Sequence, residues 1–352
     1  MKFEAITLKD IAKALGLSTS TVSRALRDSY EISEGTRKRV LEYAEKFHYH
    51  PNPAALGLKE RRTRSIGVIV SEIANTFFSQ AINGMESIAY DRGYNVIITQ
   101  SHESFEREVM NLQYLASRSI DGLLVSLSTE TQDVSHFQSV HEKGLPVVFF
   151  DRVSDEISTH KVTADNFRGA YDVVEHLIQM GYKRIAHLTN ADYLSITVER
   201  LQGYKRAMAD YGIAIPPSYI QYCPHGGLVN EETEKAVQKF LSLKKRPEVI
   251  FAAGDKLTTG CLRQLKIKNV KVPEDIAMVG FSNSELMDLF NPPLTTVRQP
   301  AFEMGQVATE MLIDLIESRR PVTEYEKRVL PTQMQIRDSS SLKKGVSRAA
   351  GK

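Results

Sequence analysis

The chain has 352 residues, of which 42% are hydrophobic and 25% are charged, and its formal net charge is +2. This length suits two or three domains, and this composition is that of an ordinary globular protein. Apolar runs stay well below the roughly 18–20 residues needed to span a bilayer, and the first residues, MKFEAITLKD, lack the apolar core of an export signal. We therefore expect a cytoplasmic protein without a membrane partner.

The charge is unevenly distributed along the chain. Residues 1–64 hold 13 Lys and Arg against 8 Asp and Glu, whereas the remainder is slightly acidic. A basic head on a mildly acidic body favours contact of the head with a polyanion, although a solvated surface alone would also account for the charge. Cys223 and Cys261 stand in no metal-like spacing, so we expect reduced thiols and no metal site.

The segment TLKDIAKALGLSTSTVSRAL has the pattern of helix, glycine turn and helix. Thr7 is a candidate cap of the first helix, with Asp10 three residues later, and Gly16 follows its last turn. Ser18 is placed to cap a second helix and Ser33 a third. Three short helices of this kind, within residues 1–50, predict an all-α helix-turn-helix domain.

A recognition helix enters the major groove of DNA with its N-terminal end, where hydroxyl groups contact phosphates or bases and an arginine fork suits guanine. The second helix begins with four hydroxyl residues and carries Arg24 opposite its apolar face. Ser18 would be a good cap in any protein, and surface arginines are common. The candidate DNA-binding residues of this domain are Thr7, Ser18, Thr19, Ser20, Thr21, Ser23 and Arg24.

Residues 51–64 are predicted to form a hinge. Asn52 is a plausible helix cap after Pro51, with Pro53 as the first helical residue. A helix this short does not survive alone in water, and Gly57 weakens it further. We expect this segment to become helical only on DNA; the alternative is a plain linker.

From residue 65 to about 340, short apolar runs alternate with helical stretches, which predicts an α/β body of two parallel-sheet lobes. The predicted strands are SIGVIVS, YNVIITQ, DGLLVSL, LPVVFF, RIAHLT, VIFAAG and IAMVGF, and the predicted helices lie near residues 77–92, 103–117, 132–143, 167–180, 198–211, 231–243, 257–265 and 304–316. We assign lobe 1 to about 65–163 and 292–323, and lobe 2 to about 164–291 and 324–340. The polar tail, 341–352, is expected to be flexible.

Two-lobed α/β proteins bind ligands where the C-terminal ends of strands face the cleft. Residues that follow the predicted strands or a lobe crossing are therefore candidate effector contacts: Asn75, Phe77, Phe78, Asp151, Arg152, Asp165, Arg200, Asp255 and Ser282. Several have structural alternatives. The aspartates at 165 and 255 are placed to cap helices, the phenylalanines would suit a core, and the arginine would suit a helix-surface ion pair.

These segments together resemble the LacI/GalR family of bacterial transcription regulators, over nearly all of residues 5–338. The matching motifs are Thr7-Leu-Lys-Asp-Ile-Ala, Gly16-Leu-Ser-Thr-Ser-Thr-Val-Ser-Arg24-Ala-Leu, Ser65-Ile-Gly-Val-Ile-Val, Gly181-Tyr-Lys-Arg-Ile-Ala and Pro292-Pro-Leu-Thr-Thr-Val-Arg-Gln-Pro. The resemblance implies a periplasmic-binding-protein-like body and base contacts from Thr19, Ser20 and Arg24. It also implies that Leu58, beside Lys59, wedges into the minor groove.

For the cleft, the resemblance most firmly implies effector contacts by Asp165 and Arg200. Together with the residue patterns it predicts a homodimeric repressor of double-stranded operator DNA, controlled by a small carbohydrate or carbohydrate derivative. The alternatives are control by a nucleobase or a protein partner, or a solute-binding protein without a DNA role. The sequence holds no GxSxG, HExxH, GxxxxGK[ST] or GxGxxG motif, so we expect no enzyme and no cofactor.

Overall fold

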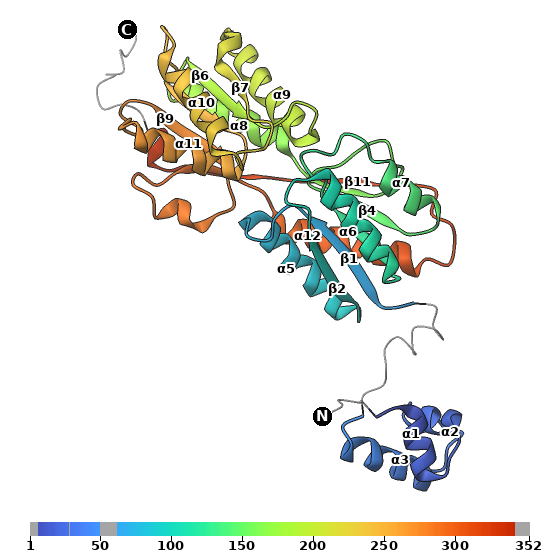
Figure 1. Cartoon of the computed structure of the whole chain (residues 1–352). Coiled ribbons are helices and arrows are strands. Elements are labelled where there is room, and N and C mark those ends of the chain that lie inside the picture. Colours follow the sequence, from blue (N-terminus) through green and yellow to red (C-terminus); the bar gives the residue numbers. More distant parts are fainter. Residues whose placement is uncertain (1–5, 28, 50–61, 342–352) are drawn as a thin grey trace. The chain divides into compact units, whose positions relative to one another are not determined.

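In a computed structural model of the chain, residues 6–27, 29–49 and 62–341 are described (Figure 1). The chain falls into two units, Met1–Thr63 and Arg64–Lys352. The predicted hinge contacts Asn52, Leu58 and Lys59 lie outside the described residues, as do residues 342–352 of the predicted tail. Among the described helices, none is both long enough and apolar enough to cross a membrane.

The described part of the first unit is a bundle of the predicted helices, α1 (Leu8–Leu15), α2 (Thr19–Ala25) and α3 (Glu34–Lys46). Their apolar faces meet in a small core formed by Ile11, Ala12, Val22, Ala25, Val40 and Ala44. Gly16 ends α1 with a φ of +66°, the left-handed conformation expected of a glycine at this position. The helix-turn-helix architecture predicted from the spacing of apolar residues is therefore present.

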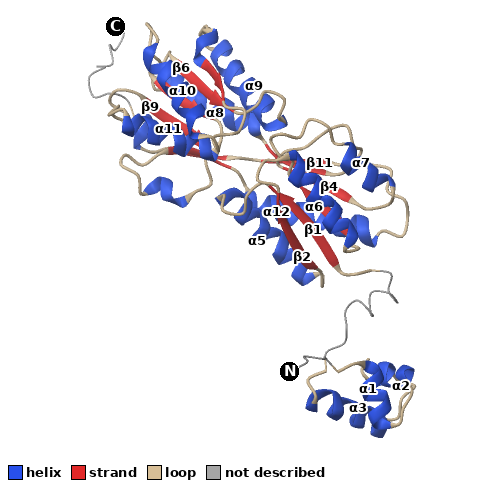
Figure 2. Cartoon of the chain, in the orientation of Figure 1, coloured by secondary structure: helices blue, strands red, loops and turns tan. Residues whose placement is uncertain are grey.

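The first lobe of the second unit contains a parallel sheet covered on both faces (Figure 2). Its strand order is β11-β5-β4-β3-β1-β2. The strands are β1 (Ser65–Val70), β2 (Asn95–Gln100), β3 (Gly122–Val125), β4 (Val147–Phe150), β5 (Lys161–Ala164) and β11 (Lys327–Leu330). Helices α5 (Thr76–Asp91) and α12 (Ala301–Glu317) pack on one face, and α6 (Phe105–Ser117) and α7 (Ser135–Glu142) on the other.

The second lobe repeats this arrangement around a sheet of order β12-β10-β9-β8-β6-β7. Its strands are β6 (Ile185–Thr189), β7 (Ile220–Tyr222), β8 (Val249–Ala252), β9 (Ala277–Phe281), β10 (Thr295–Arg298) and β12 (Gln333–Gln335), the last antiparallel to β10. Helices α8 (Asn166–Gln179) and α9 (Ser195–Asp210) cover one face, and α10 (Asn230–Ser242) and α11 (Asp255–Ile267) the other. Short 3₁₀ turns lie at Pro217–Tyr219, Glu285–Asp288 and Asp338–Ser340.

Within the described residues, the chain passes between the lobes after β5, after β10 and after β11. The predicted lobe boundaries are wrong at two of these points. We expected residues 292–323 in lobe 1, yet β10 pairs with β9 in lobe 2; we expected residues 324–340 in lobe 2, yet β11 pairs with β5 in lobe 1. The lobe to which each segment belongs depends on strand pairing between residues far apart in the chain. The local sequence pattern does not indicate that pairing.

Candidate functional sites

The exposed N-terminus of α2 carries an ordered cluster of hydroxyl groups. The Ser18 hydroxyl accepts a hydrogen bond from the Thr21 backbone N–H at 3.0 Å. It also shares hydrogen bonds with the hydroxyls of Ser20 at 2.7 Å and Thr21 at 2.8 Å. Ser18 is thus the predicted helix cap, and Thr19 is exposed beside it. The cap fixes the direction in which this end of the helix presents its polar groups.

Thr7 and Ser23, also predicted DNA contacts, have hydrogen-bond partners within the head. Thr7 and Asp10 form a reciprocal capping box at the start of α1, and the Thr7 hydrogen bonds lower the pKa of Asp10. The Ser23 hydroxyl accepts a hydrogen bond from Arg27 at 2.9 Å. Thr7 therefore has a structural role in capping α1.

Arg24 lies on the exposed face of α2, as its spacing from Val22 and Ala25 predicts. Its guanidinium group forms an ion pair with Glu31, the two charged atoms being 2.9 Å apart. The Arg24 side chain is 59% exposed and the Glu31 side chain 46%, so water competes with this contact. Among the described residues, the only charge contact of this arginine is therefore a weak, solvent-exposed ion pair.

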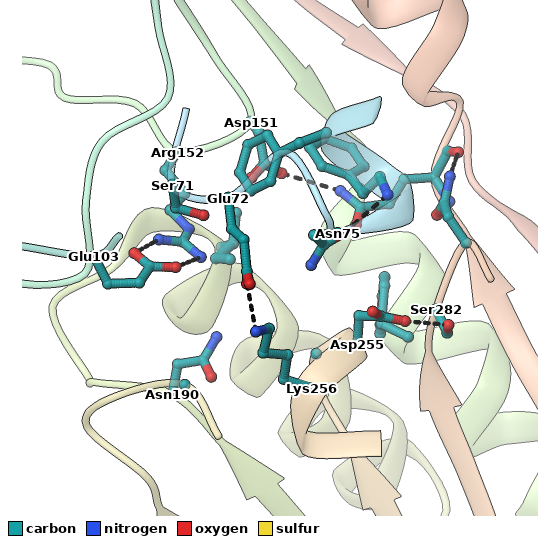
Figure 3. Close-up of a pocket in the computed structure, with 18 of the residues that line it drawn as sticks. Ser71, Glu72, Asn75, Glu103, Asp151, Arg152, Asn190, Asp255, Lys256 and Ser282 are labelled. Carbon is teal, nitrogen blue, oxygen red and sulfur yellow. Dashed lines mark hydrogen bonds and ion pairs between the residues drawn. The ribbon is translucent and has the colours of Figure 1, made fainter. Parts of the chain in front are cut away.

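The second candidate site is a cavity between the two lobes of the body (Figure 3). Its polar residues follow the C-terminal ends of strands in both sheets, as expected for this fold. Eight of the residues predicted to contact an effector line it: Asn75, Phe77, Phe78, Asp151, Arg152, Arg200, Asp255 and Ser282. The cavity measures about 70 Å³, well below the ~300 Å³ of a typical ligand pocket, because side chains from the two lobes already meet across it.

On the lobe 1 side, Arg152 and Glu103 form a two-pronged ion pair, with nitrogen–oxygen distances of 2.6 and 3.0 Å. Burial raises the pKa of Glu103, but the charge and hydrogen bonds of Arg152 outweigh it and the net pKa is lowered. Asp151 is buried, has a φ of +59° and accepts a hydrogen bond from Gln299 at 3.1 Å. Burial raises the pKa of Asp151, and the charges of Arg152 and Arg200 offset part of the rise.

Arg200 lies almost wholly inside lobe 2, with 3% of its surface exposed. It donates hydrogen bonds of 2.8 Å to the Asn166 side chain and to the Ala253 carbonyl, and its guanidinium carbon lies 4.0 Å from the centre of the Phe281 ring. Burial lowers the pKa of Arg200 to about 10, although Asp151 and Glu199 raise it in part. The predicted alternative, an ion pair on a helix surface, is wrong because the side chain is buried.

Two polar pairs complete the cavity. Asp255, at the start of α11, accepts a hydrogen bond from the Ser282 hydroxyl, and burial raises the pKa of its carboxyl group. Glu72 of lobe 1 forms an ion pair with Lys256 of lobe 2 directly across the cavity (Figure 3). A charged contact therefore joins the two lobes at the candidate site itself.

Phe77 and Phe78, for which the sequence allowed a place in the core or in the cleft, lie at the boundary of the two. They are 6% and 2% exposed, belong to the lobe 1 core and also line the cavity. Their rings meet edge to face at 5.1 Å. Asn75 caps α5 by accepting a hydrogen bond from the Phe77 N–H at 2.9 Å. The start of α5 is thus a rigid apolar wall of the cavity.

Asp165 is placed differently from our expectation. Its carboxylate caps α8, accepting a hydrogen bond from the Arg168 N–H at 2.9 Å, and it is not among the residues that line the cavity. Its position directly before a helix explains this. The cavity also contains polar residues that we did not predict: Ser71, Glu72, Glu103, Asn190, Lys256, Asn283 and Gln299.

The two units therefore define a class of protein: a helix-turn-helix head joined to a two-lobed body of the periplasmic-binding-protein type. Residues 7–52 match the family model of bacterial regulatory proteins of the lacI family, and residues 174–340 match the model of a periplasmic binding protein-like domain. Both matches agree with the folds of the head and the body.

Similarity to known proteins extends over nearly the whole chain. The chain is 31% identical over 337 residues to the HTH-type transcriptional repressor PurR of Vibrio cholerae serotype O1 (strain ATCC 39315 / El Tor Inaba N16961). The alignment covers 96% of this chain and 98% of that protein. The transcriptional regulator CelR in complex with cellobiose aligns with a TM-score of 0.71 and 29% identity, over 95% of this chain and 99% of that one.

The Lac repressor dimer bound to operator and the anti-inducer ONPF aligns with a TM-score of 0.81, over 96% of this chain and all of that one. At 24% identity this likeness shows the fold alone. The similarity to PurR and the match of the head show the family. The chain belongs to the lacI family of bacterial regulatory proteins, and it is a DNA-binding transcriptional regulator controlled through an effector.

Proposed function

We propose that this regulator is a cytoplasmic homodimeric repressor without enzymatic activity. In this proposal a neutral carbohydrate bound in the cleft controls its affinity for operator DNA. The observation that carries the DNA part is the exposed N-terminus of α2, where Ser18 orders the hydroxyl cluster and Arg24 stands beside it. Thr19, Ser20 and Arg24 contact bases in this proposal, and Leu58 enters the minor groove. The operator-bound Lac repressor dimer supports the assembly on DNA.

The chemistry of the cavity supports the carbohydrate part. Two of the three cations that line the cavity are already neutralised, Arg152 by Glu103 and Lys256 by Glu72. The third, Arg200, is buried and donates hydrogen bonds to the Asn166 side chain and the Ala253 carbonyl. Asp151 and Asp255 each accept one hydrogen bond. Their carboxylate oxygens can therefore accept further hydrogen bonds from the hydroxyl groups of a ligand. Phe77 and Phe78 offer an apolar wall for the face of a sugar ring. The cellobiose complex of CelR supports a sugar in this fold.

Ligand control follows from the position of the cavity. Because residues of both lobes line it, a bound molecule contacts both lobes at once and stabilises one relative position of them. A ligand shifts such an equilibrium only by its difference in affinity for the two states. In this proposal that difference reaches the DNA through the hinge at residues 51–64.

The DNA part is tested by selecting a preferred operator from randomised oligonucleotides and then measuring binding of Arg24→Ala. We expect a loss of about 1–3 kcal/mol on the operator and a much smaller loss on random DNA, because a base contact is sequence-dependent. Arg27→Ala removes the same charge from the turn directly after the same helix and is the matched control. Equal losses on both DNAs with Arg24→Ala would overturn the base-contact role.

The effector part is tested by calorimetry of the full chain against monosaccharides, disaccharides, sugar phosphates and nucleobases. We expect binding of a neutral sugar and a change in operator affinity when it binds. Binding of a nucleobase alone would overturn the carbohydrate assignment while leaving the regulator assignment intact.

A further inference from the structure

Glu31 lies outside α2, yet its side chain reaches the exposed face of that helix. It belongs to the segment that connects α2 to α3, and its Oε2 atom is 2.9 Å from Nη1 of Arg24. Two contacts fix this segment. The Ser29 N–H donates a hydrogen bond of 3.1 Å to the Arg24 carbonyl, and Ile32 packs against the core of the head. The fold of the head therefore brings Glu31 to Arg24.

A carboxylate at this place is unexpected in a head that binds DNA. Two other arginines of the head donate to uncharged oxygens, Arg27 to the Ser23 hydroxyl at 2.9 Å and Arg39 to the Leu15 carbonyl at 3.4 Å. A carboxylate repels phosphates and so weakens binding to DNA of any sequence. An ion pair as exposed as that of Arg24 also adds little to stability in water. Neither stability nor general affinity for DNA accounts for this carboxylate.

The carboxylate restricts what the guanidinium group of Arg24 can bind. A guanidinium group has five N–H donors, so a contact at Nη1 leaves donors for a second acceptor. The O6 and N7 atoms of guanine are uncharged and can share the guanidinium group with a carboxylate. A phosphate carries a negative charge, and a carboxylate a few ångströms away repels it. This repulsion grows when DNA displaces water from the pair, because the local dielectric constant falls.

We propose that Glu31 is a specificity-determining residue of the head. It positions Arg24 for guanine and prevents Arg24 from binding a phosphate in DNA of any sequence. This rests on the proposed base contact of Arg24. Glu31 acts through Arg24 and is a positioning residue. Removal of its charge should therefore strengthen binding to random DNA and weaken discrimination at one base pair of the operator.

The test compares the full chain with its Glu31→Gln variant on the selected operator, on operators with single base-pair changes and on random DNA. The base pair read by Arg24 is the one at which Arg24→Ala loses discrimination. There we expect Glu31→Gln to lose about fivefold or more of the discrimination, which is part of what a bidentate arginine–guanine contact provides. Discrimination at the other base pairs should be unchanged.

The salt dependence of binding is an independent readout. In Glu31→Gln, Arg24 can bind a phosphate of random DNA, so the affinity for random DNA should rise. The slope of log K against log salt concentration should become steeper by about 0.9 for each bound head. Glu42→Gln is the matched control, because it removes the same charge from an exposed position of α3. It should leave the discrimination and the slope as in wild type.

The double variant Arg24→Ala/Glu31→Gln checks that Glu31 acts through Arg24. Its discrimination at the same base pair should equal that of Arg24→Ala alone, and a further loss would overturn the positioning role in favour of a direct base contact by Glu31. The same binding by Glu31→Gln and Glu42→Gln overturns this proposal alone and leaves the base contact of Arg24 intact. If Arg24→Ala loses discrimination at no base pair, that base contact fails, and this proposal fails with it.

Discussion

The head and the body place their candidate functional groups in opposite environments. In the head, the hydroxyls of α2 and the guanidinium group of Arg24 are exposed, and the small core beneath them consists of Ile11, Val22 and other aliphatic residues. In the body, Asp151 and Arg200 are almost wholly buried and hydrogen-bonded to several elements of the fold. We infer that replacing an exposed functional residue of the head changes DNA binding with little change in stability. Replacing a buried functional residue of the body changes effector binding and stability together.

The largest effect expected from this comparison is at Arg200. Arg200→Ala leaves the Asn166 side chain and the Ala253 carbonyl without their buried donor, which should cost about 3 kcal/mol of unfolding free energy as well as effector binding. Urea denaturation of the full chain, with the body followed separately from the head, measures this loss. Arg200→Lys, which keeps the charge but loses the planar guanidinium group, is the control. Its unfolding free energy should lie between those of wild type and Arg200→Ala. Unchanged stability of the body in Arg200→Ala would contradict the comparison.

The next effect is a pH dependence that arises in the core of lobe 2. His187 is fully buried, its ring lies parallel to that of Tyr204 at 4.9 Å, and burial lowers its pKa to about 3. The unfolded chain therefore binds a proton below about pH 6.5 that the folded chain rejects, so stability is lost as pH falls from 6.5 towards 3.

Between pH 7 and pH 5 this loss should amount to about 2 kcal/mol for the body. Denaturation of wild type and of His187→Phe at both pH values isolates the contribution, because the phenylalanine preserves the stacked ring and removes the titrating group. The same pH dependence in the variant would show that other groups are responsible.

The smallest effects are expected in the head, where two neighbouring hydroxyl residues form a matched pair. Ser18→Ala removes the cap of α2 and should cost about 1 kcal/mol of head stability. Thr19→Ala, at an exposed position, should change stability by less than about 0.5 kcal/mol and still weaken operator binding. Thermal unfolding and DNA titration of both variants measure the two properties. A large loss of stability in Thr19→Ala would remove the distinction between head and body.

Much of the architecture was predictable because its elements are long and apolar. The helices of the head follow from their caps and apolar spacing, and strands such as β1 and β9 follow from continuous apolar runs. Our pattern missed β5, β7, β10, β11 and β12, which have three or four residues with polar side chains among them. Pairing with a neighbouring strand, rather than local sequence, defines such strands.

The candidate site was predictable where one simple rule applies: polar residues after parallel strands face the cleft. The rule led us to Asp151, Asp255 and Ser282, and applied consistently it would also have found Glu103 after β2 and Asn190 after β6. The same rule also predicted Asp165, but the carboxylate of this residue caps α8 instead.

Contacts between lobes had no comparable signature in the sequence. The ion pair of Glu72 with Lys256 and the hydrogen bond of Tyr193 to Thr129 join residues that only the tertiary fold brings together. Neither contact could therefore be predicted from the sequence.

The ion pair between Glu72 and Lys256 has a consequence for experiments on DNA. Both side chains are partly exposed, at 26% and 34%, so dissolved ions shorten the Debye length around them and weaken their attraction. The same ions weaken contacts with DNA phosphates by counterion competition. A salt titration of operator binding therefore combines loosening of the lobes with loss of phosphate contacts, and Glu72→Gln, which lacks the first contribution, separates the two.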